Sequence, residues 1–183
     1  MRVHGAERSS FPAMGNDSRL DDFYRWAYDP GTNIVRGKYA EYLVGRALGC
    51  LDTTIGAWEP YDLLVDDRCR VEVKASAYVQ NWTQAALSDL QWTGLRSKQG
   101  FAADVYVLSA YLAKSRSEYD ITNTDHWCFW VIGRGVIQEN GWKSMGEATA
   151  RRLAGEPIGY AGLAAAVRSQ CGSVLRDRVE PRA

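Results

Sequence analysis

The stretch that decides the fold is WEPYDLLVDDRCRVEVKAS, which runs from Trp58 to Ser76. Two strand-like apolar runs flank a polar turn, and alternate residues of a strand share one face. Val71 and Val73 therefore share a face, while Glu72 and Lys74 share the opposite face. Because the apolar faces of the two runs are natural partners, the sequence predicts a hairpin with one charged side.

The polar pattern also predicts the register of this hairpin. If Asp62 lies opposite Glu72, then Val65 lies opposite Cys69, and the loop consists of Asp66-Asp67-Arg68. Three-residue hairpin loops are common, and Asp is a favoured turn residue. A shift of one residue would place Asp62 opposite an apolar side chain and mix the two faces. The predicted register instead puts two carboxylates on neighbouring strands, with β-carbons roughly 4.5–5.5 Å apart.

Two carboxylates at this spacing repel each other unless one is protonated or a cation lies between them. Oxygen ligands of this kind suit Mg²⁺, and Mn²⁺ can substitute for it. We expect Asp62 and Glu72 to bind the ion, with the backbone carbonyl of Val73 as a further ligand and Lys74 beside the attacking water. The alternative is a solvated strand face on which Glu72 and Lys74 form a surface ion pair.

Composition restricts the class of protein. The formal net charge of zero argues against a strongly basic nucleic-acid binder, but a metal ion can offset local acids in an enzyme. Four scattered cysteines without a C-x-x-C pair predict no structural zinc site and a reduced, cytoplasmic protein. The sequence contains neither an apolar run of about 18 residues nor the apolar region of a signal peptide, so we expect no membrane helix.

The order of elements predicts an α/β fold with a mixed central sheet flanked by helices. The 183 residues fit a single domain, which we expect to span 21–172 between a tail at 1–20 and a tail at 173–183. Helical spacing of apolar residues predicts a helix within 35–48 that Gly49 ends. The hairpin follows, and then strands within 101–113 and 126–133 and helices within 144–155 and 160–172.

The hairpin resembles the signature of the PD-(D/E)XK nucleases, the restriction-endonuclease-like superfamily. The resemblance rests on Pro60-Tyr61-Asp62, nine further residues, and then Glu72-Val73-Lys74; Tyr61 separates the proline from the acid, so the literal Pro-Asp pair is absent. Glu41, on the preceding helix, occupies the place of a further acid in that family. Gly37 and Gly45 lie four residues to either side of it, on one helical stripe that could approach the sheet closely.

This resemblance implies Mg²⁺-dependent hydrolysis of phosphodiester bonds, with DNA as the expected substrate and RNA as the alternative. It assigns metal binding to Asp62 and Glu72, a direct or water-mediated role to Glu41, and positioning of the water to Lys74. A homodimer would be needed to cut both strands of a duplex. The alternative is a catalytically inactive nucleic-acid-binding or assembly module with the same fold.

Residues outside this set are candidates for contacts with nucleic acid. Four of them are polar: Lys38, Gln80, Arg96 and Lys98. Gln80 can equally cap a turn, and the cations can equally belong to a solvated loop or helix face. Trp82 and Trp92 can stack on a base, although most of the seven tryptophans must be core.

Overall fold

The computed structural model describes residues 27–51, 59–97 and 100–179, so the predicted tail at 1–20 lies outside the described residues. In chain order the elements are α2 (Asn33–Leu48), β1 (Leu63–Val65), β2 (Cys69–Ala77), β3 (Gln91–Thr93), β4 (Val105–Tyr111), η1 (Arg116–Glu118), η2 (Thr124–His126), β5 (Trp127–Gly133), α3 (Arg134–Glu139), β6 (Ser144–Gly146), α4 (Glu147–Ala154) and α5 (Tyr160–Val179).

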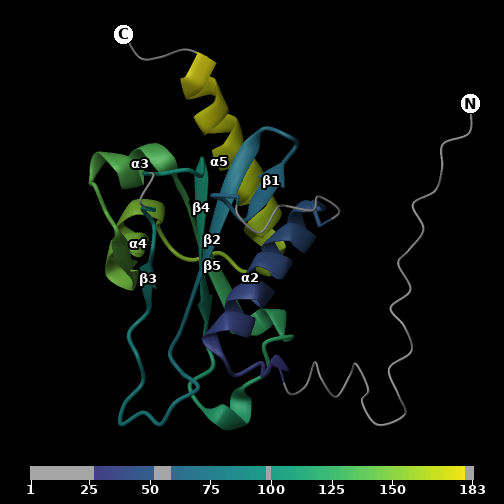
Figure 1. The fold of residues 1–183 in the computed structure, drawn as a ribbon, viewed down its shortest axis with the longest axis vertical. Coiled ribbons are helices and arrows are strands. Elements are labelled where there is room, and N and C mark those ends of the chain that lie inside the picture. Colours follow the sequence, from purple (N-terminus) through teal and green to yellow (C-terminus); the bar gives the residue numbers. More distant parts are fainter. Residues whose placement is uncertain (1–26, 52–58, 98–99, 180–183) are drawn as a thin grey trace, which may run out of the picture.

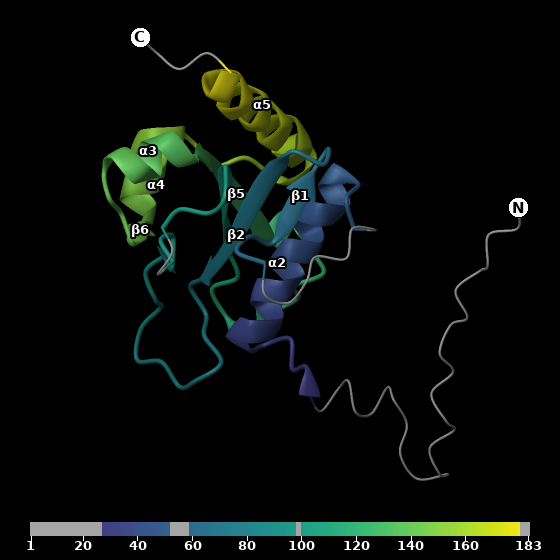
Figure 2. The same ribbon diagram turned by 45° about the horizontal axis from the view of Figure 1, so that its top comes forward.

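A mixed sheet forms the centre of the fold, as the element order predicts. Its strand order is β1-β2-β4-β5, with β1 antiparallel to β2, β2 parallel to β4, and β4 antiparallel to β5. Figure 1 shows α2 and α5 on one side of this sheet and α3 and α4 on the other. Figure 2 shows the same layers from a tilted view, with the β1–β2 hairpin beside α2. The fold is therefore α/β with a mixed central sheet and flanking helices.

The predicted hairpin register is correct. Leu63 pairs with Val71 and Val65 pairs with Cys69, which leaves 66–68 as a three-residue loop. Asp66 and Asp67 adopt left-handed backbone conformations, with φ of 49° and 55°. Aspartate tolerates this conformation better than most residues do. The loop thus reverses the chain without shifting the charged face of β2.

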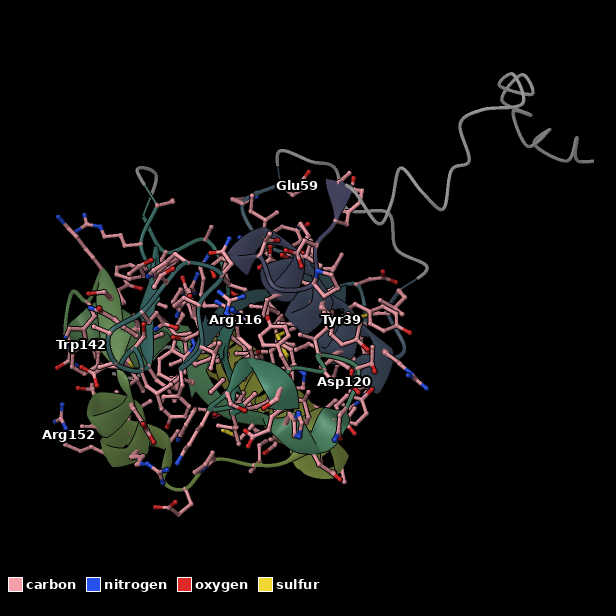
Figure 3. The ribbon with its side chains drawn as sticks, turned by 90° about the horizontal axis from the view of Figure 1, so that it is seen from below. Tyr39, Glu59, Arg116, Asp120, Trp142 and Arg152 are labelled. Atoms are coloured by element: carbon pink, nitrogen blue, oxygen red, sulfur yellow. A yellow bond between two sulfur atoms is a disulfide. The ribbon has the colours of Figure 1, made fainter. Side chains whose placement is uncertain are left out.

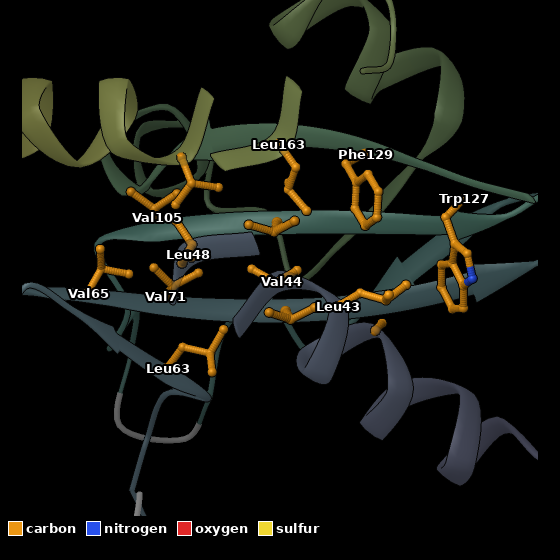
Figure 4. Packing of buried hydrophobic residues seen from close by; sticks show 14 of the residues in the cluster. Leu43, Val44, Leu48, Leu63, Val65, Val71, Val105, Trp127, Phe129 and Leu163 are labelled. Atoms are coloured by element: carbon orange, nitrogen blue, oxygen red, sulfur yellow. The ribbon is translucent and has the colours of Figure 1, made fainter. Parts of the chain in front are cut away.

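One hydrophobic cluster lies between the sheet and the helices α2 and α5. Leu43 and Val44 of α2 and Leu163 of α5 are fully buried against Val71 and Val105 of the sheet (Figure 4). The side chain of Thr32 caps the start of α2, and Gly49 ends the helix with φ of 69°, as predicted. Burial of this apolar stripe holds α2 across β2 and determines where Glu41 lies.

A second cluster fills the opposite face of the sheet. Trp92 and Trp130 meet there edge to face, with ring centroids 5.4 Å apart, and Tyr106 and Leu108 of β4 lie in the same cluster. The elements β3, β6 and α3 help to cover this side. The sequence patterns predict neither β3 nor α3, and the prediction of a helix within 144–155 is wrong at 144–146, where β6 lies. The strands β3 and β6 have three residues each, too few to display an alternating pattern.

The helix α5 extends to Val179, beyond residue 172, where we expected a tail to begin. In the described part of the chain, no helix combines the length and the apolar character needed to cross a membrane.

The prediction that all cysteines are reduced is wrong for two of them. Cys69, at the start of β2, forms a disulfide with Cys171 of α5, and 102 residues separate the two in sequence. Both side chains are buried in the cluster beneath α5. Such a pairing depends on the packing of the helix against the hairpin, so the spacing of the cysteines along the chain could not reveal it. Cys50 and Cys128 are free.

Candidate functional site

Asp62 lies where the chain enters β1, and two hydrogen bonds fix it against β2. Its backbone N–H donates to the carbonyl of Val71 at 3.0 Å, and its Oδ2 accepts from the N–H of Val73 at 2.8 Å. The side chain thus takes a hydrogen bond that a neighbouring strand residue would otherwise make. Asp62 is held beside the segment that carries Glu72 and Lys74.

Glu72 and Lys74 lie on the face of β2 opposite to Val71 and Val73. They form an ion pair between Lys74 Nζ and Glu72 Oε1, and their side chains retain 27% and 16% exposure respectively. The pair is therefore mostly buried rather than solvated. The Glu72–Lys74 ion pair of the predicted alternative is present, but the solvated surroundings of that alternative are not.

Glu41 reaches the region from α2, on the other side of the sheet. Its Oε2 accepts a hydrogen bond from Lys38 Nζ at 2.6 Å. Lys38 lies one turn earlier on the same helix and is 73% exposed, so its ammonium remains accessible to a ligand. Of the two glycines flanking Glu41, only Gly45 approaches the sheet closely. A β-carbon there would lie 3.3 Å from Leu63, whereas one at Gly37 would contact nothing within 4 Å.

The charge of Asp62 acts on both glutamates. Burial raises the pKa of Glu72, and the charges of Asp62 and Glu41 raise it further against the opposing influence of Lys74. Burial also raises the pKa of Glu41, where the hydrogen bond from Lys38 opposes it and the charge of Asp62 adds to it. The hydrogen bond to Glu41 raises the pKa of Lys38, and the charges of Asp62 and Glu72 contribute as well. Asp62 therefore lies within electrostatic range of acids from both sides of the sheet.

The short length of β1 makes this convergence possible. β1 pairs only with 69–71, whereas β2 continues to Ala77. The N–H and C=O of a strand residue point to the same side. Because the N–H of Val73 donates to Asp62, its carbonyl points to the same edge of β2, beyond the last residue that β1 pairs. This edge offers carboxylate and carbonyl oxygens together, the donor types that Mg²⁺ prefers.

Each of these carboxylates already has its own donor. Glu41 binds Lys38, Glu72 binds Lys74, and Asp62 binds the backbone of Val73. Accordingly, residues 27–51, 59–97 and 100–179 contain no cluster of three or more His, Cys, Asp or Glu side chains arranged to hold a metal. The chemistry of the donors suits a hard cation, and rotation of the two glutamate side chains away from their lysines would be needed to direct all three acids at one ion.

Two neighbours of the site were absent from the sequence predictions. A β-carbon on Gly94 would lie 3.8 Å from Lys74 Cε, so the backbone after β3 covers this lysine closely. Tyr106 pairs with Glu72 across the parallel β2–β4 ladder. Burial, with the charge of Glu72 next in importance, raises the pKa of Tyr106 to about 12. The pairing of β2 with β4 identifies Tyr106 as the neighbour of Glu72, but the sequence alone does not determine which residues of the two strands pair.

The predicted nucleic-acid contacts lie in different surroundings. Gln80 is buried, where its Oε1 accepts from Arg36 and its Nε2 donates to Ala77, which is a structural role. Arg96 stacks over the ring of Phe101, and both line an open cavity of about 630 Å³. Lys98 lies outside the described residues.

The two tryptophans named with these contacts have opposite environments. Trp92 is buried core, with its indole N–H donating to Ser109, whereas Trp82 is exposed.

No family model matches this chain, and no curated protein is detectably similar to it.

Proposed function

We propose that this protein is a Mg²⁺-dependent nuclease with a restriction-endonuclease-like core, and that it hydrolyses phosphodiester bonds in DNA. The observation that carries the proposal is that Asp62, held on the N–H of Val73, lies beside the Glu72–Lys74 ion pair, and that its charge raises the pKa of both Glu72 and Glu41. The order of α2 followed by the two strands of the hairpin supports the proposal, because the resemblance likewise places a helix with an acid before the hairpin.

The acids would hold the ion. Asp62 and Glu72 are its proposed direct ligands, with the Val73 carbonyl beside them and Glu41 acting directly or through a water. A bound Mg²⁺ would acidify a water molecule and polarise the phosphate. Positive charge at this position would also offset the mutual repulsion that contributes to the raised pKa of Glu41 and Glu72.

The two lysines have separate roles in this proposal. Lys74 donates to Glu72 here, and the same ammonium can orient a water and offset negative charge that develops on the phosphate oxygens. The backbone near Gly94 covers Lys74 and limits the positions that its ammonium can take. Lys38 is exposed beside Glu41 and can contact a phosphate next to the one that reacts.

Cleavage of a labelled DNA duplex and of supercoiled plasmid in Mg²⁺ tests the proposal. We expect Asp62→Asn and Lys74→Ala each to lower the rate by about 10²-fold or more, since each removes a group that acts on the reacting phosphate. Asp67→Asn is the matched control, because it changes an exposed acid in the same hairpin. Equal cleavage by the wild type, Asp62→Asn and Lys74→Ala would identify a contaminating nuclease and overturn the assignment.

The inactive nucleic-acid-binding or assembly module remains the second candidate, because each carboxylate is paired without a metal. Calorimetry with Mn²⁺ separates the two. Binding that is lost in Asp62→Asn supports the nuclease, whereas the absence of binding by the wild type supports the module.

A further inference from the structure

A second polar region lies at the carboxyl ends of the parallel strands β2 and β4. A cavity of about 590 Å³ opens there, between the segment that follows β2 and the segment that follows β4. Ligands of α/β proteins commonly bind beyond the carboxyl ends of such strands. The cavity volume is in the range typical of small-ligand sites.

One wall of this cavity is apolar and aromatic. Trp82 is 54% exposed and Leu87 is 47% exposed, and both line the cavity with Val79 and Ala86. A tryptophan this exposed, beside an exposed leucine, presents a flat apolar surface to solvent. Such a surface is the kind of platform on which nucleobases stack.

The opposite wall is cationic. Lys114 and Arg116 line the cavity, and Lys114 Nζ lies 5.9 Å from the centroid of the Tyr78 ring. Figure 3 views the molecule from below, and Arg116 lies near the middle of this face. The guanidinium of Arg116 donates to the carbonyls of Gln80 and Trp82, which ties the cationic wall to the aromatic one. Within the described part of the chain, neither cation forms an ion pair.

A buried arginine supports the cavity from beneath. Arg36 of α2 is 3% exposed and donates to the Val79 carbonyl and to Gln80 Oε1 at 3.3 and 3.1 Å. Its Nε has no hydrogen-bond partner, and no described carboxylate forms an ion pair with it. Gln84 accepts from the N–H of Gln80 and thereby closes the loop. The loop that carries Trp82 is thus held in place by Arg36, which pairs with no carboxylate among the described residues.

We infer that this cavity binds one unstacked nucleotide of the substrate, with its base on Trp82 and its phosphate at Lys114 and Arg116. The inference rests on the proposed function and specifies its substrate: DNA with an unpaired nucleotide to one side of the bond that is cut. Val79 lies five positions after Lys74, which is at most about 17 Å of extended strand. That length corresponds to about five phosphates of one DNA strand, which are 3.4 Å apart along a duplex.

Binding of fluorescein-labelled DNA in Mg²⁺-free buffer with chelator tests this inference without cleavage. The probes are a blunt duplex and the same duplex with a five-nucleotide single-stranded tail. We expect the wild type to bind the tailed duplex more tightly. Trp82→Ala should weaken that binding about 5- to 150-fold, the loss that corresponds to one stacked base, while Trp82→Phe retains most of it. Lys114→Ala should weaken binding and lower the slope of log affinity against log salt by about one.

Lys143→Ala is the matched charge control, because it removes an exposed lysine outside the cavity and should leave binding of both probes unchanged. Equal affinity of the wild type for the two probes, or tailed-duplex binding that Trp82→Ala leaves intact, would overturn the inference. Cleavage in Mg²⁺ is measured separately on both probes. If the protein binds the tail through Trp82 but does not cleave DNA, the nucleotide-binding cavity is supported and the nuclease is rejected. If it cleaves DNA and Trp82→Ala leaves cleavage unchanged, the nuclease is supported and the cavity is rejected.

Discussion

The disulfide between Cys69 and Cys171 makes a strong prediction about stability. It links the first residue of β2 to the helix α5. Close to it, Arg168 of α5 donates to the carboxylate of Asp66 and to the carbonyl of Leu48. The helix therefore holds the hairpin of the candidate site covalently at one point and by hydrogen bonds at another. Cys171→Ala removes the covalent link and one buried sulfur, and leaves the hydrogen-bond partners of Arg168 unchanged.

The size of the effect follows from the length of chain that the disulfide closes. A cross-link between residues 102 apart lowers the entropy of the unfolded chain by an amount worth about 4.7 kcal/mol at 25 °C. Native disulfides typically contribute about 2–5 kcal/mol, so this value is near the upper end. For a domain of this size, a loss of 4.7 kcal/mol corresponds to a fall in Tm of about 10–20 °C.

Urea denaturation followed by tryptophan fluorescence, without reductant, measures the loss. Cys128→Ala is the matched control, because Cys128 is also buried but free, so it reports the cost of removing a buried sulfur. We expect Cys171→Ala to lose several kcal/mol more than Cys128→Ala, and thiol titration of the unfolded wild type to find two reactive cysteines rather than four. Equal losses in the two variants, or four reactive thiols, would refute the reasoning.

Three further predictions concern the elements that form the site. Gly37→Ala should raise the free energy of unfolding by about 0.5–1 kcal/mol, because a β-carbon at that position has open space around it. Gly45→Ala should lower the free energy of unfolding, since a β-carbon there would meet two leucine side chains at 2.6 and 3.3 Å. Thermal denaturation of both variants distinguishes the two effects. Asp67→Gly should stabilise the hairpin by about 1 kcal/mol, because glycine adopts φ of 55° without strain, and urea denaturation measures it. The pKa of Glu72 is raised in the folded state, so the folded protein holds the proton of Glu72 more strongly than the unfolded chain does. The stability of the metal-free protein should therefore fall as the pH rises from about 4.5. Urea denaturation at a series of pH values measures this fall, and Glu72→Gln should make it smaller.

Much of the fold could be predicted because its main elements carry strong local signals. Helical spacing and Gly49 gave the extent of α2, and runs of β-branched and aromatic residues gave β4 and β5. Short elements failed for the opposite reason. The strands β3 and β6 form mainly because Trp92 and Met145 pair and pack on the second cluster, which is a tertiary effect without a local pattern.

In the candidate site too, contacts within the hairpin could be predicted and contacts between distant segments could not. Alternation along the hairpin predicted its register, and with it the neighbours Asp62 and Glu72. The contact of Gly94 with Lys74 and the position of Tyr106 beside Glu72 depend on which strands pair in the parallel ladder. The Cys69–Cys171 link depends likewise on where α5 packs. Contacts between distant segments lie beyond what a pattern along the chain can specify.

Stability alone gives no reason for the acids at the edge of β2. A mostly buried ion pair such as Glu72–Lys74 contributes little that well-packed apolar residues of similar volume would not contribute. Burial and the neighbouring charge of Asp62 both disfavour the ionised form of Glu72, and Glu41 is subject to the same two effects. A strand that served only the sheet would avoid this cost with an apolar side chain. Neighbouring acids whose pKa values are raised by burial and by one another's charge are typical of functional sites, which is the reason for testing metal binding before any other property.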